Sequence, residues 1–492
     1  MKKTMAILLM AAVSYSALAK PAAIFQDGMV LQRERPVPVW GTEAPGAKVT
    51  VSFAGQQKSA VADAAGKWRV DFDPMPACSK PRNLTIVSSN QTISQSNNRT
   101  ILHDVLVGEV WLASGQSNME CPIWNRSSHY RDGVGAMKIA MTRRDDVRFF
   151  KVRREWSLKP QPVVGSWRKF VPASFDMAKE DPLLSAIAFY YALEINQALG
   201  VPVGIVDTCW CGTNIDAWTP LETIRATPGL EYVANWKHVT DWKDAKGTHT
   251  ICGLRQQPGV LWNGMVADLV PFACRGAIWY QGCHNSDEPN DYALKMRALY
   301  DGWSKAWGRK DFRFYFSELA PLVQTFVAMR EQMKTFAAGE PNAAMAVISD
   351  HGCLFNAHPP AKEIVARRLA LFALRRDYGF DLVCDSPTVK GWTVEGGAFR
   401  LELDHARWLY WGSDDASDPS GFEIAGEDGR FVPAKVMNFD HEKQVGSNVL
   451  VVASSEVKDP KTLRFLYSKP WKATIYSDAC LPLGCFELQK QK

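Results

Sequence analysis

This chain of 492 residues lacks the features that would place it in a specialised class of protein. It contains no internal repeat and no low-complexity tract. Beyond the first nineteen residues, no apolar run reaches the roughly 18 residues that a membrane helix needs. The formal net charge is only +5, which is too small to predict a nucleic-acid partner. These absences leave an ordinary globular composition, with length for about two to four domains.

The amino terminus has the pattern of a secretory signal peptide. Lys2 and Lys3 precede an apolar stretch from Met5 to Val13, and Ala17-Leu18-Ala19 is a small-residue cleavage site. We therefore expect cleavage after Ala19, removal of residues 1–19, and a secreted or periplasmic protein without a membrane span.

The eleven cysteines all lie after this segment. In an oxidising compartment some of them should pair, and an odd count leaves at least one unpaired within a single chain. Cys480 and Cys485 are close in sequence and form the simplest local disulfide to expect. The remaining connectivity does not follow from the spacing.

Changes in hydrophobic pattern divide the rest of the chain into three parts. Residues 20–103 contain short alternating runs separated by Gly, Pro, Asn and Asp, which favours a small β-sandwich. Residues 104–384 alternate strands with helices, which predicts right-handed crossovers and a doubly wound, parallel α/β sheet. An insertion or long loop is expected near residues 225–262. Residues 385–492 return to short strands and turns, so we expect a C-terminal β-rich portion.

Within the α/β part, the pattern predicts particular elements. The predicted strands cover residues 276–282, 312–320 and 343–350. The predicted helices cover residues 184–200, 292–308, about 325–338, and 361–379.

Four polar segments fall where predicted strands end, which is where an open parallel sheet binds its ligands. They are residues 114–118, 209–218, 279–285 and 350–360. Ser117 in the first segment is the candidate nucleophile. A serine hydroxyl needs a base to take its proton, and His358 in the last segment is the candidate base. His284 and His351 remain rivals for that role.

An acyl-transfer site also needs donors for an oxyanion. The candidates are the backbone N–H groups of Ser117 and Gly212 and the side-chain amide of Asn285. Each residue type has an ordinary structural use as well, in helix caps, turns or positive-φ positions. The hypothesis therefore depends on all of the segments occurring together.

Several blocks carry a family resemblance. Four blocks surround the polar segments, and they occur in the order GEVWLASGQSNME, CGTNIDAW, WYQG..N and HPPAKEIVARRLA. Two further blocks are AAIFQDGMVLQRERPVPVWGTEAPGAKVTV before them and GFEIAGEDGRFVPAKV after them. These blocks resemble the sialate O-acetylesterases and related carbohydrate acetylesterases of the SGNH hydrolase superfamily. The resemblance implies a flavodoxin-like catalytic domain that hydrolyses acetyl esters on sugars without a metal or cofactor. It also implies that Ser117 is the nucleophile, His358 the base, and Gly212 and Asn285 the completion of the oxyanion hole.

The chain departs from the family pattern beside the site. The family usually has Gly-Gly-Thr where this chain has Cys211-Gly212-Thr213, and WYQGE where it has Cys283. Two acids near the histidine are replaced by Cys353 and Asn356. The expected orienting carboxylate is therefore missing.

Three groups are candidates to orient the histidine ring in place of that carboxylate. The side-chain carbonyl of Asn356 is the first, as in cysteine proteases with a Cys-His-Asn arrangement. Asp350 is the second, if its loop folds back, and a backbone carbonyl is the third.

Soft ligands also gather at the predicted strand ends. They are Cys209, Cys211, Cys283, His284 and Cys353. Zinc could bind such a set, but the spacing matches no standard zinc motif, so we expect no metal. A disulfide between Cys283 and Cys353 is the preferred hypothesis.

Three further residues are candidates for substrate binding. Gln116 precedes the nucleophile, Trp210 could stack on a sugar ring, and Arg330 could pair with a sialic acid carboxylate. A tryptophan is more often part of a core, and a helix arginine more often faces solvent.

Together these observations predict a serine esterase that deacetylates O-acetylated sialic acids through an acetyl-serine intermediate, with no nucleic-acid partner. One alternative keeps the chemistry and changes the substrate to acetylated xylan or another polysaccharide. Another is a carbohydrate-binding protein on a decayed esterase scaffold. Neither the oligomeric state nor the O-acetyl position follows from the sequence.

Overall fold

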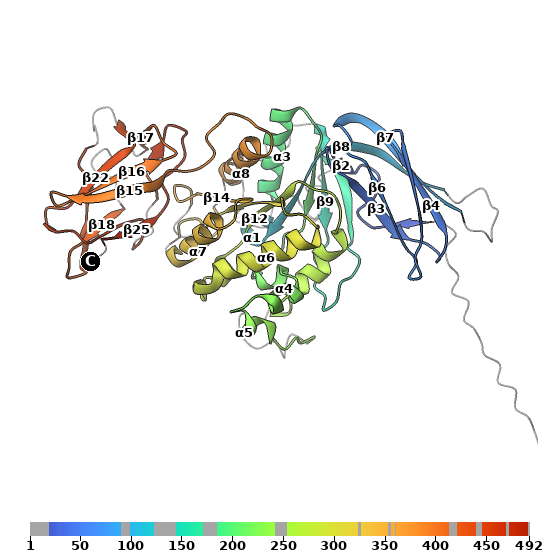
Figure 1. Cartoon of the computed structure of the whole chain (residues 1–492), viewed down its shortest axis with the longest axis horizontal. Helices are drawn as coiled ribbons and strands as arrows, with labels where there is room; N and C mark the ends of the chain where they lie inside the picture. Colours follow the sequence, from blue (N-terminus) through green and yellow to red (C-terminus); the bar gives the residue numbers. More distant parts are fainter. Residues whose placement is uncertain are drawn as a thin grey trace, which may run out of the picture.

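The protein has a mixed α/β fold in which a large sheet is flanked by β-rich parts (Figure 1). The computed structural model describes residues 19–89, 99–122, 144–170, 185–241, 253–322, 326–352, 356–359, 361–412, 421–438, 445–468 and 472–490. The coloured ribbon of Figure 1 runs from the blue N-terminal strands, through the central helices and sheet, to the red C-terminal strands.

The N-terminal part is built from short antiparallel strands. One sheet contains β1 (Lys20–Pro21), β3 (Val37–Thr42) and β6 (Lys67–Phe72). In a second set of strands, β4 (Lys48–Phe53) pairs with both β5 (Gln56–Val61) and β7 (Cys78–Ser89). Alternate residues of β6 are buried, as expected for strands with one face in a core. The β-rich character predicted for this part is confirmed.

A single long strand joins the N-terminal part to the central sheet. Strand β8 (Arg99–Gly115) pairs in its first half with β7, and with the parallel strand β2 (Val30–Gln32). Its residues are buried without interruption from Val105 to Gly115, where helices and neighbouring strands cover it. Residues 103 and 104 therefore lie within one continuous strand.

The central sheet has the order β10-β9-β11-β8-β12-β13-β14. Its other strands are β9 (Arg144–Val152), β10 (Gly165–Phe170), β11 (Val203–Asp207), β12 (Gly276–Tyr280), β13 (Arg313–Ser317) and β14 (Ala343–Ala346). All neighbours from β9 to β14 are parallel, and β10 is an antiparallel edge strand. The chain order places β11 on one side of β8 and β12 on the other, so the strand order reverses between β8 and β12. A crevice at the carboxyl ends of these two strands is the expected ligand site.

Helices lie on both sides of this sheet (Figure 1). Helix α3 (Ala186–Leu199) packs on α8 (Lys362–Arg376), and α6 (Tyr292–Ala306) packs on α7 (Val327–Ala338). The four predicted helices are confirmed to within a few residues. Local chemistry sets the bounds of α3, because the Ser185 side chain accepts from the Ala188 N–H and Gly200 ends the helix at φ 64°.

The expected insertion near residues 225–262 contains short helical pieces where the structure describes it. Helix α4 (Leu221–Ala226) leads into it, α5 (Glu231–Ala234) lies within it, and a helical turn covers Gly253–Gln256. Among the described helices, none has the length and apolar character needed to cross a membrane.

The C-terminal part is an antiparallel β structure with its own core, and the β-rich character predicted for it is confirmed. Its strands are β15 (Thr388–Glu395), β16 (Ala398–Asp404), β17 (Trp408–Trp411), β18 (Phe422–Ala425), β19 (Phe431–Pro433), β20 (Lys435–Val436), β21 (Val445–Ser447), β22 (Val449–Ala453), β23 (Thr462–Phe465), β24 (Ile475–Ser477) and β25 (Phe486–Gln489).

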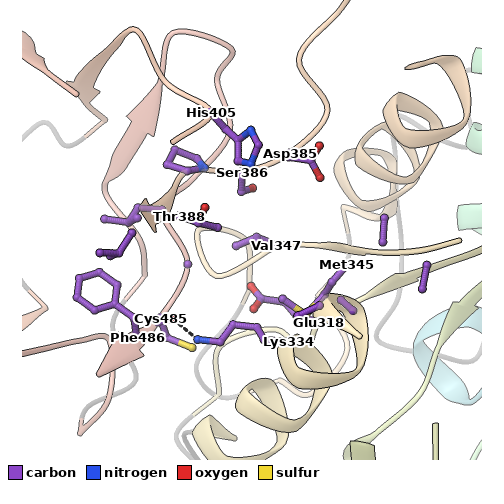
Figure 2. A pocket seen from close by; sticks show the side chains of 18 of the residues that line it. Glu318, Lys334, Met345, Val347, Asp385, Ser386, Thr388, His405, Cys485 and Phe486 are labelled. Carbon is purple, nitrogen blue, oxygen red and sulfur yellow. Dashed lines mark hydrogen bonds between the residues drawn. The ribbon is translucent and has the colours of Figure 1, made fainter. Parts of the chain in front are cut away.

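A cavity of about 610 Å³ lies between this C-terminal part and the edge of the α/β part (Figure 2). Its walls come from α7, from β14 and from the segments around Thr388 and Phe486. Lys334 of α7 donates to the carbonyl of Cys485 at 2.8 Å, which ties the two parts together at one wall. None of the candidate catalytic residues lines this cavity.

The expected disulfide between Cys480 and Cys485 is wrong, because both are free thiols. Cys485 is buried and faces Glu331 of α7, whereas Cys480 is exposed in the turn after β24 and contacts Tyr410. The two side chains therefore point to different neighbours. Cys283 is also a free thiol, and Cys353, its proposed partner, lies outside the described residues.

Candidate active site

The turn after β8 places Ser117 at the carboxyl end of that strand, beside the end of β12. Gly115 has φ 135°, and a Cβ at this position would lie 2.3 Å from the carbonyl oxygen of Tyr280. A glycine is therefore required for the two strand ends to approach each other. Ser117 then begins the short helix α1 (Ser117–Glu120).

The side chain of His358 contacts Ser117 at this strand end. The Nε2 atom of His358 lies 2.7 Å from the Oγ atom of Ser117, which is hydrogen-bonding distance. Burial is the larger cause and the charge of Lys362 the smaller cause of a lowered pKa of His358, which is about 4. The imidazole is therefore neutral at neutral pH, which is the state that can accept a proton.

Gln116 holds the two strand ends together. It is 3% exposed, and its Oε1 atom accepts from the backbone N–H groups of Gly282 at 3.1 Å and His284 at 3.3 Å. The structure thus places Gln116 in the wall behind the nucleophile. His284, one of the rival bases, lies on the short helical turn Cys283–Asn285 that follows β12.

The two remaining oxyanion candidates lie in neighbouring loops. Gly212 has φ 66°, and Gln256 donates to its carbonyl at 3.1 Å. The Oδ1 atom of Asn285 accepts from the N–H of Ile215 at 3.0 Å and from Gln281 at 2.8 Å. These two bonds use the carbonyl of Asn285, so its NH₂ group is the donor, and this amide also bonds the buried carboxylate of Asp216.

Comparison with known proteins shows the family of the chain. The family model described as carbohydrate esterase, sialic acid-specific acetylesterase, matches residues 107–357, which is more than half of the chain. The chain belongs to this family. The matched range contains Ser117, Gly212 and Asn285, and it ends one residue before His358.

Individual relatives cover most of the chain. The sialate O-acetylesterase of Mus musculus is 29% identical over 76% of this chain and 76% of its own length. The human sialate O-acetylesterase is 27% identical over 73% of this chain and 71% of its own length. The crystal structure of a carbohydrate acetylesterase from Xanthomonas citri superposes with a TM-score of 0.80 at 29% identity, covering 96% of this chain and 100% of that one. The protein is a carboxylic ester hydrolase.

Asn356 supports the histidine loop of this esterase through the backbone. Its Oδ1 atom accepts from the backbone N–H of His358 at 2.9 Å, which is the bond of an Asx turn. Asp350, the second candidate orienter, instead binds both terminal nitrogens of Arg368 at 2.6 and 2.7 Å. The Asp350 carboxylate is therefore directed toward α8.

The candidate substrate-binding residues differ in position. Trp210 is half-buried, its backbone N–H donates to the carbonyl of Gly115 at 3.1 Å, and the guanidinium of Arg255 lies 5.3 Å from its ring centroid. Arg330 is 3% exposed, and its Nε donates to the carbonyl of Leu319 at 3.0 Å. Its side chain lies in the interior, near the buried carboxylate of Glu318.

The cysteine-rich strand ends hold buried and half-buried free thiols. Burial raises the pKa of Cys209 well above its usual value, and it raises that of Cys283 to about 11. Both groups are therefore neutral thiols at neutral pH. Within the part of the chain that the structure describes, no three His, Cys, Asp or Glu side chains come together as a metal site.

Sequence reasoning missed two buried residues next to the catalytic pair, Asn118 and Lys362. Asn118 follows Ser117 directly, and Lys362 is the first residue of α8, four positions after His358. Each is 2% exposed. The sequence signal that could have found them is a polar residue at a position where the pattern of the neighbouring residues predicts a buried side chain.

Proposed function

We propose that this esterase removes O-acetyl groups from sialic acids through an acetyl-serine intermediate. The observation that carries the proposal is the 2.7 Å contact between Ser117 Oγ and His358 Nε2, in a chain of the sialic acid-specific acetylesterase family. The names of the mammalian relatives support the choice of sialic acid as substrate.

The first half of the reaction forms the acetyl-enzyme. His358 Nε2 takes the hydroxyl proton as Ser117 Oγ attacks the acetyl carbonyl carbon. The tetrahedral oxyanion forms near the N–H groups of Ser117 and Gly212 and the amide of Asn285. The bond to the sugar oxygen then breaks, and the imidazolium returns its proton to that oxygen.

The second half releases acetate. A water molecule gives a proton to the neutral His358 and attacks the acetyl-serine carbonyl. Collapse of the new oxyanion breaks the bond to Ser117 Oγ, which regains a proton from the imidazolium. The cycle needs only the chain and water.

The proposal extends to architecture and location. The parallel strand order around β8 supports a doubly wound, SGNH-type catalytic domain over about residues 104–384, between β-rich domains at 20–103 and 385–492. The pattern of residues 1–19 supports export, with cleavage after Ala19.

The test is acetate release from O-acetylated sialic acid and from acetylated xylan by the mature protein. Ser117→Ala and His358→Ala are the matched variants, with circular dichroism to show that both are folded. Release from sialic acid that both variants lose supports the proposal. Release from xylan alone replaces the substrate, and activity that survives Ser117→Ala contradicts the mechanism. Sugar binding without any turnover favours the decayed scaffold.

A further inference from the structure

A buried lysine lies behind the catalytic pair without a carboxylate partner among the described residues. The Nζ atom of Lys362 lies 2.5 Å from the Oδ1 atom of Asn118. Among the residues that the structure describes, the thiols of Cys121 and Cys283 also act on its charge, and the ring of Tyr280 lies 5.9 Å away. A buried ammonium normally needs an anion beside it, so this lysine is held at an energetic cost.

The lysine fixes the orientation of the Asn118 amide. An ammonium group is only a donor, so the amide atom facing it must be the oxygen. The Nδ2 atom of Asn118 is thereby directed to the carbonyl of Ala357, to which it donates at 2.9 Å. Asn118 follows the nucleophile and Ala357 precedes the base. One amide thus connects the two catalytic segments.

Lys362 also connects this amide to the helix that follows the histidine. It is the first residue of α8, which packs on α3. The chain from Ala357 to Lys362 is therefore tied to Asn118 at both of its ends. His358 lies between these two bonds, and its ring reaches Ser117.

We propose that Asn118 and Lys362 are positioning residues, which hold the segment of His358 toward Ser117. The inference rests on the proposed Ser-His chemistry. A carboxylate would both orient the ring and stabilise the imidazolium. The ammonium of Lys362 disfavours the imidazolium. Asn118 and Lys362 therefore position His358 but do not stabilise its charged form. Asn356 adds to the same geometry by holding the backbone of His358.

Three single variants separate the bonds. Lys362→Met removes the donor while keeping a long side chain. Lys362→Gln keeps an N–H donor on a shorter side chain. Asn118→Asp keeps the oxygen that Lys362 contacts but removes the N–H that binds Ala357. Lys334→Met is the matched control, because Lys334 contacts Glu331 and Cys485 at the interdomain cavity (Figure 2).

The measurements are kcat and KM for p-nitrophenyl acetate, with near-ultraviolet circular dichroism to normalise rates to folded protein. We expect Lys362→Met and Asn118→Asp each to lower kcat about 10-fold to 100-fold, in the range of a misplaced catalytic group. KM should change less than about 2-fold, and Lys362→Gln should recover part of the loss. The double variant should be no slower than the slower single variant, because both bonds act through one amide.

The pH profile gives a readout that a purely structural role would not move. Removing the Lys362 ammonium should shift the acid limb of kcat/KM upward, toward the ordinary histidine value of about 6.5. Unchanged kcat per folded molecule in both Lys362→Met and Asn118→Asp would overturn the inference. Losses of kcat in the two single variants that add fully in the double variant would also overturn the inference. Failure of the wild type on acetylated sialic acid, with p-nitrophenyl acetate still cleaved, would reject the proposed substrate and leave this test intact.

Discussion

His358 and Ser117 are 241 positions apart in the sequence, yet Nε2 and Oγ lie 2.7 Å apart. The contact exists because β8 ends at the point where the strand order reverses and the loop after β14 returns over the same edge of the sheet. The catalytic pair is thus a product of the sheet topology, held by a small number of buried polar bonds.

The pH dependence of turnover should reflect the perturbed histidine. Burial and the nearby Lys362 lower the pKa of His358 to about 4. The neutral form is the base, so kcat/KM should stay level through the neutral range and fall as the pH drops through about 4. A pH-rate profile with p-nitrophenyl acetate measures this. An acid limb near 6.5 would show that the imidazole is more solvated than in this structure.

Asn356 should act through the backbone of the histidine loop. Asn356→Ala removes the acceptor for the His358 N–H, and a hydrogen bond of about 1 kcal/mol predicts a loss in kcat of about 5-fold. Asn356→Asp keeps an acceptor oxygen, so its kcat should stay within about 3-fold of the wild type. A large increase with Asp would instead indicate that this side chain contacts the imidazole ring. Stopped-flow or steady-state kinetics on the two variants separate these roles.

Arg330 should affect stability and not substrate affinity. It is buried, bonded to the Leu319 carbonyl, and close to the buried Glu318, whose pKa burial raises and Arg330 lowers. Arg330→Met should therefore lower the melting temperature while KM for acetylated sialic acid changes less than about 2-fold. Thermal unfolding and initial rates at several substrate concentrations test this. A KM increase of about 10-fold without destabilisation would restore Arg330 as a carboxylate ligand.

Glu109 should stabilise the junction between the N-terminal part and the central sheet. Its fully buried carboxylate accepts from Arg33 at 2.6 Å, Arg275 at 2.8 Å and Gln32 at 3.1 Å. Removing one partner of a buried ion pair typically costs about 3–5 kcal/mol. Glu109→Gln should therefore lower the free energy of unfolding at pH 7 by about that amount, as measured by urea denaturation.

The same carboxylate predicts a pH dependence of stability. Burial alone raises the pKa of Glu109, but the bonds and charge of Arg275 and the bonds of Arg33 and Gln32 lower it below the usual value of 4.5. Because the folded-state pKa is depressed, its stabilisation is present above about pH 4.5. It is lost as the pH falls through the folded-state pKa. The difference between wild type and Glu109→Gln should thus shrink at acid pH, and a difference independent of pH would contradict this assignment.

Hydrophobic periodicity predicted the long helices and most of the parallel strands of the α/β part, but it did not predict strands β9 and β10. The helices predicted over 292–308 and 361–379 are observed as α6 and α8 with similar bounds. Their apolar residues repeat with helical spacing because one face packs on the sheet. A long buried strand such as β8 can be predicted from its continuous apolar run, because both of its faces are covered. Neither signal depends on knowing which strands are neighbours.

The predicted disulfide between Cys480 and Cys485 is wrong because closeness in sequence does not determine the direction of the two side chains. Cys480 and Cys485 are separated by five positions, but Cys485 turns toward α7 while Cys480 remains in an exposed turn. The direction of a side chain depends on which domain packs beside it. For the same reason the interior position of Arg330 did not follow from its place on a predicted helix.

By itself, the sequence determined the alternation of strands and helices, the β-rich ends, and the polar segments that supply Ser117, His358, Gly212 and Asn285. These depend on local periodicity and on residue types with specific chemistry. The tertiary structure alone decided which polar side chains meet, including the bonds of Asn118 with Lys362 and Ala357. Such contacts join residues more than two hundred positions apart, and their geometry depends on strand order and helix packing, which no local pattern encodes.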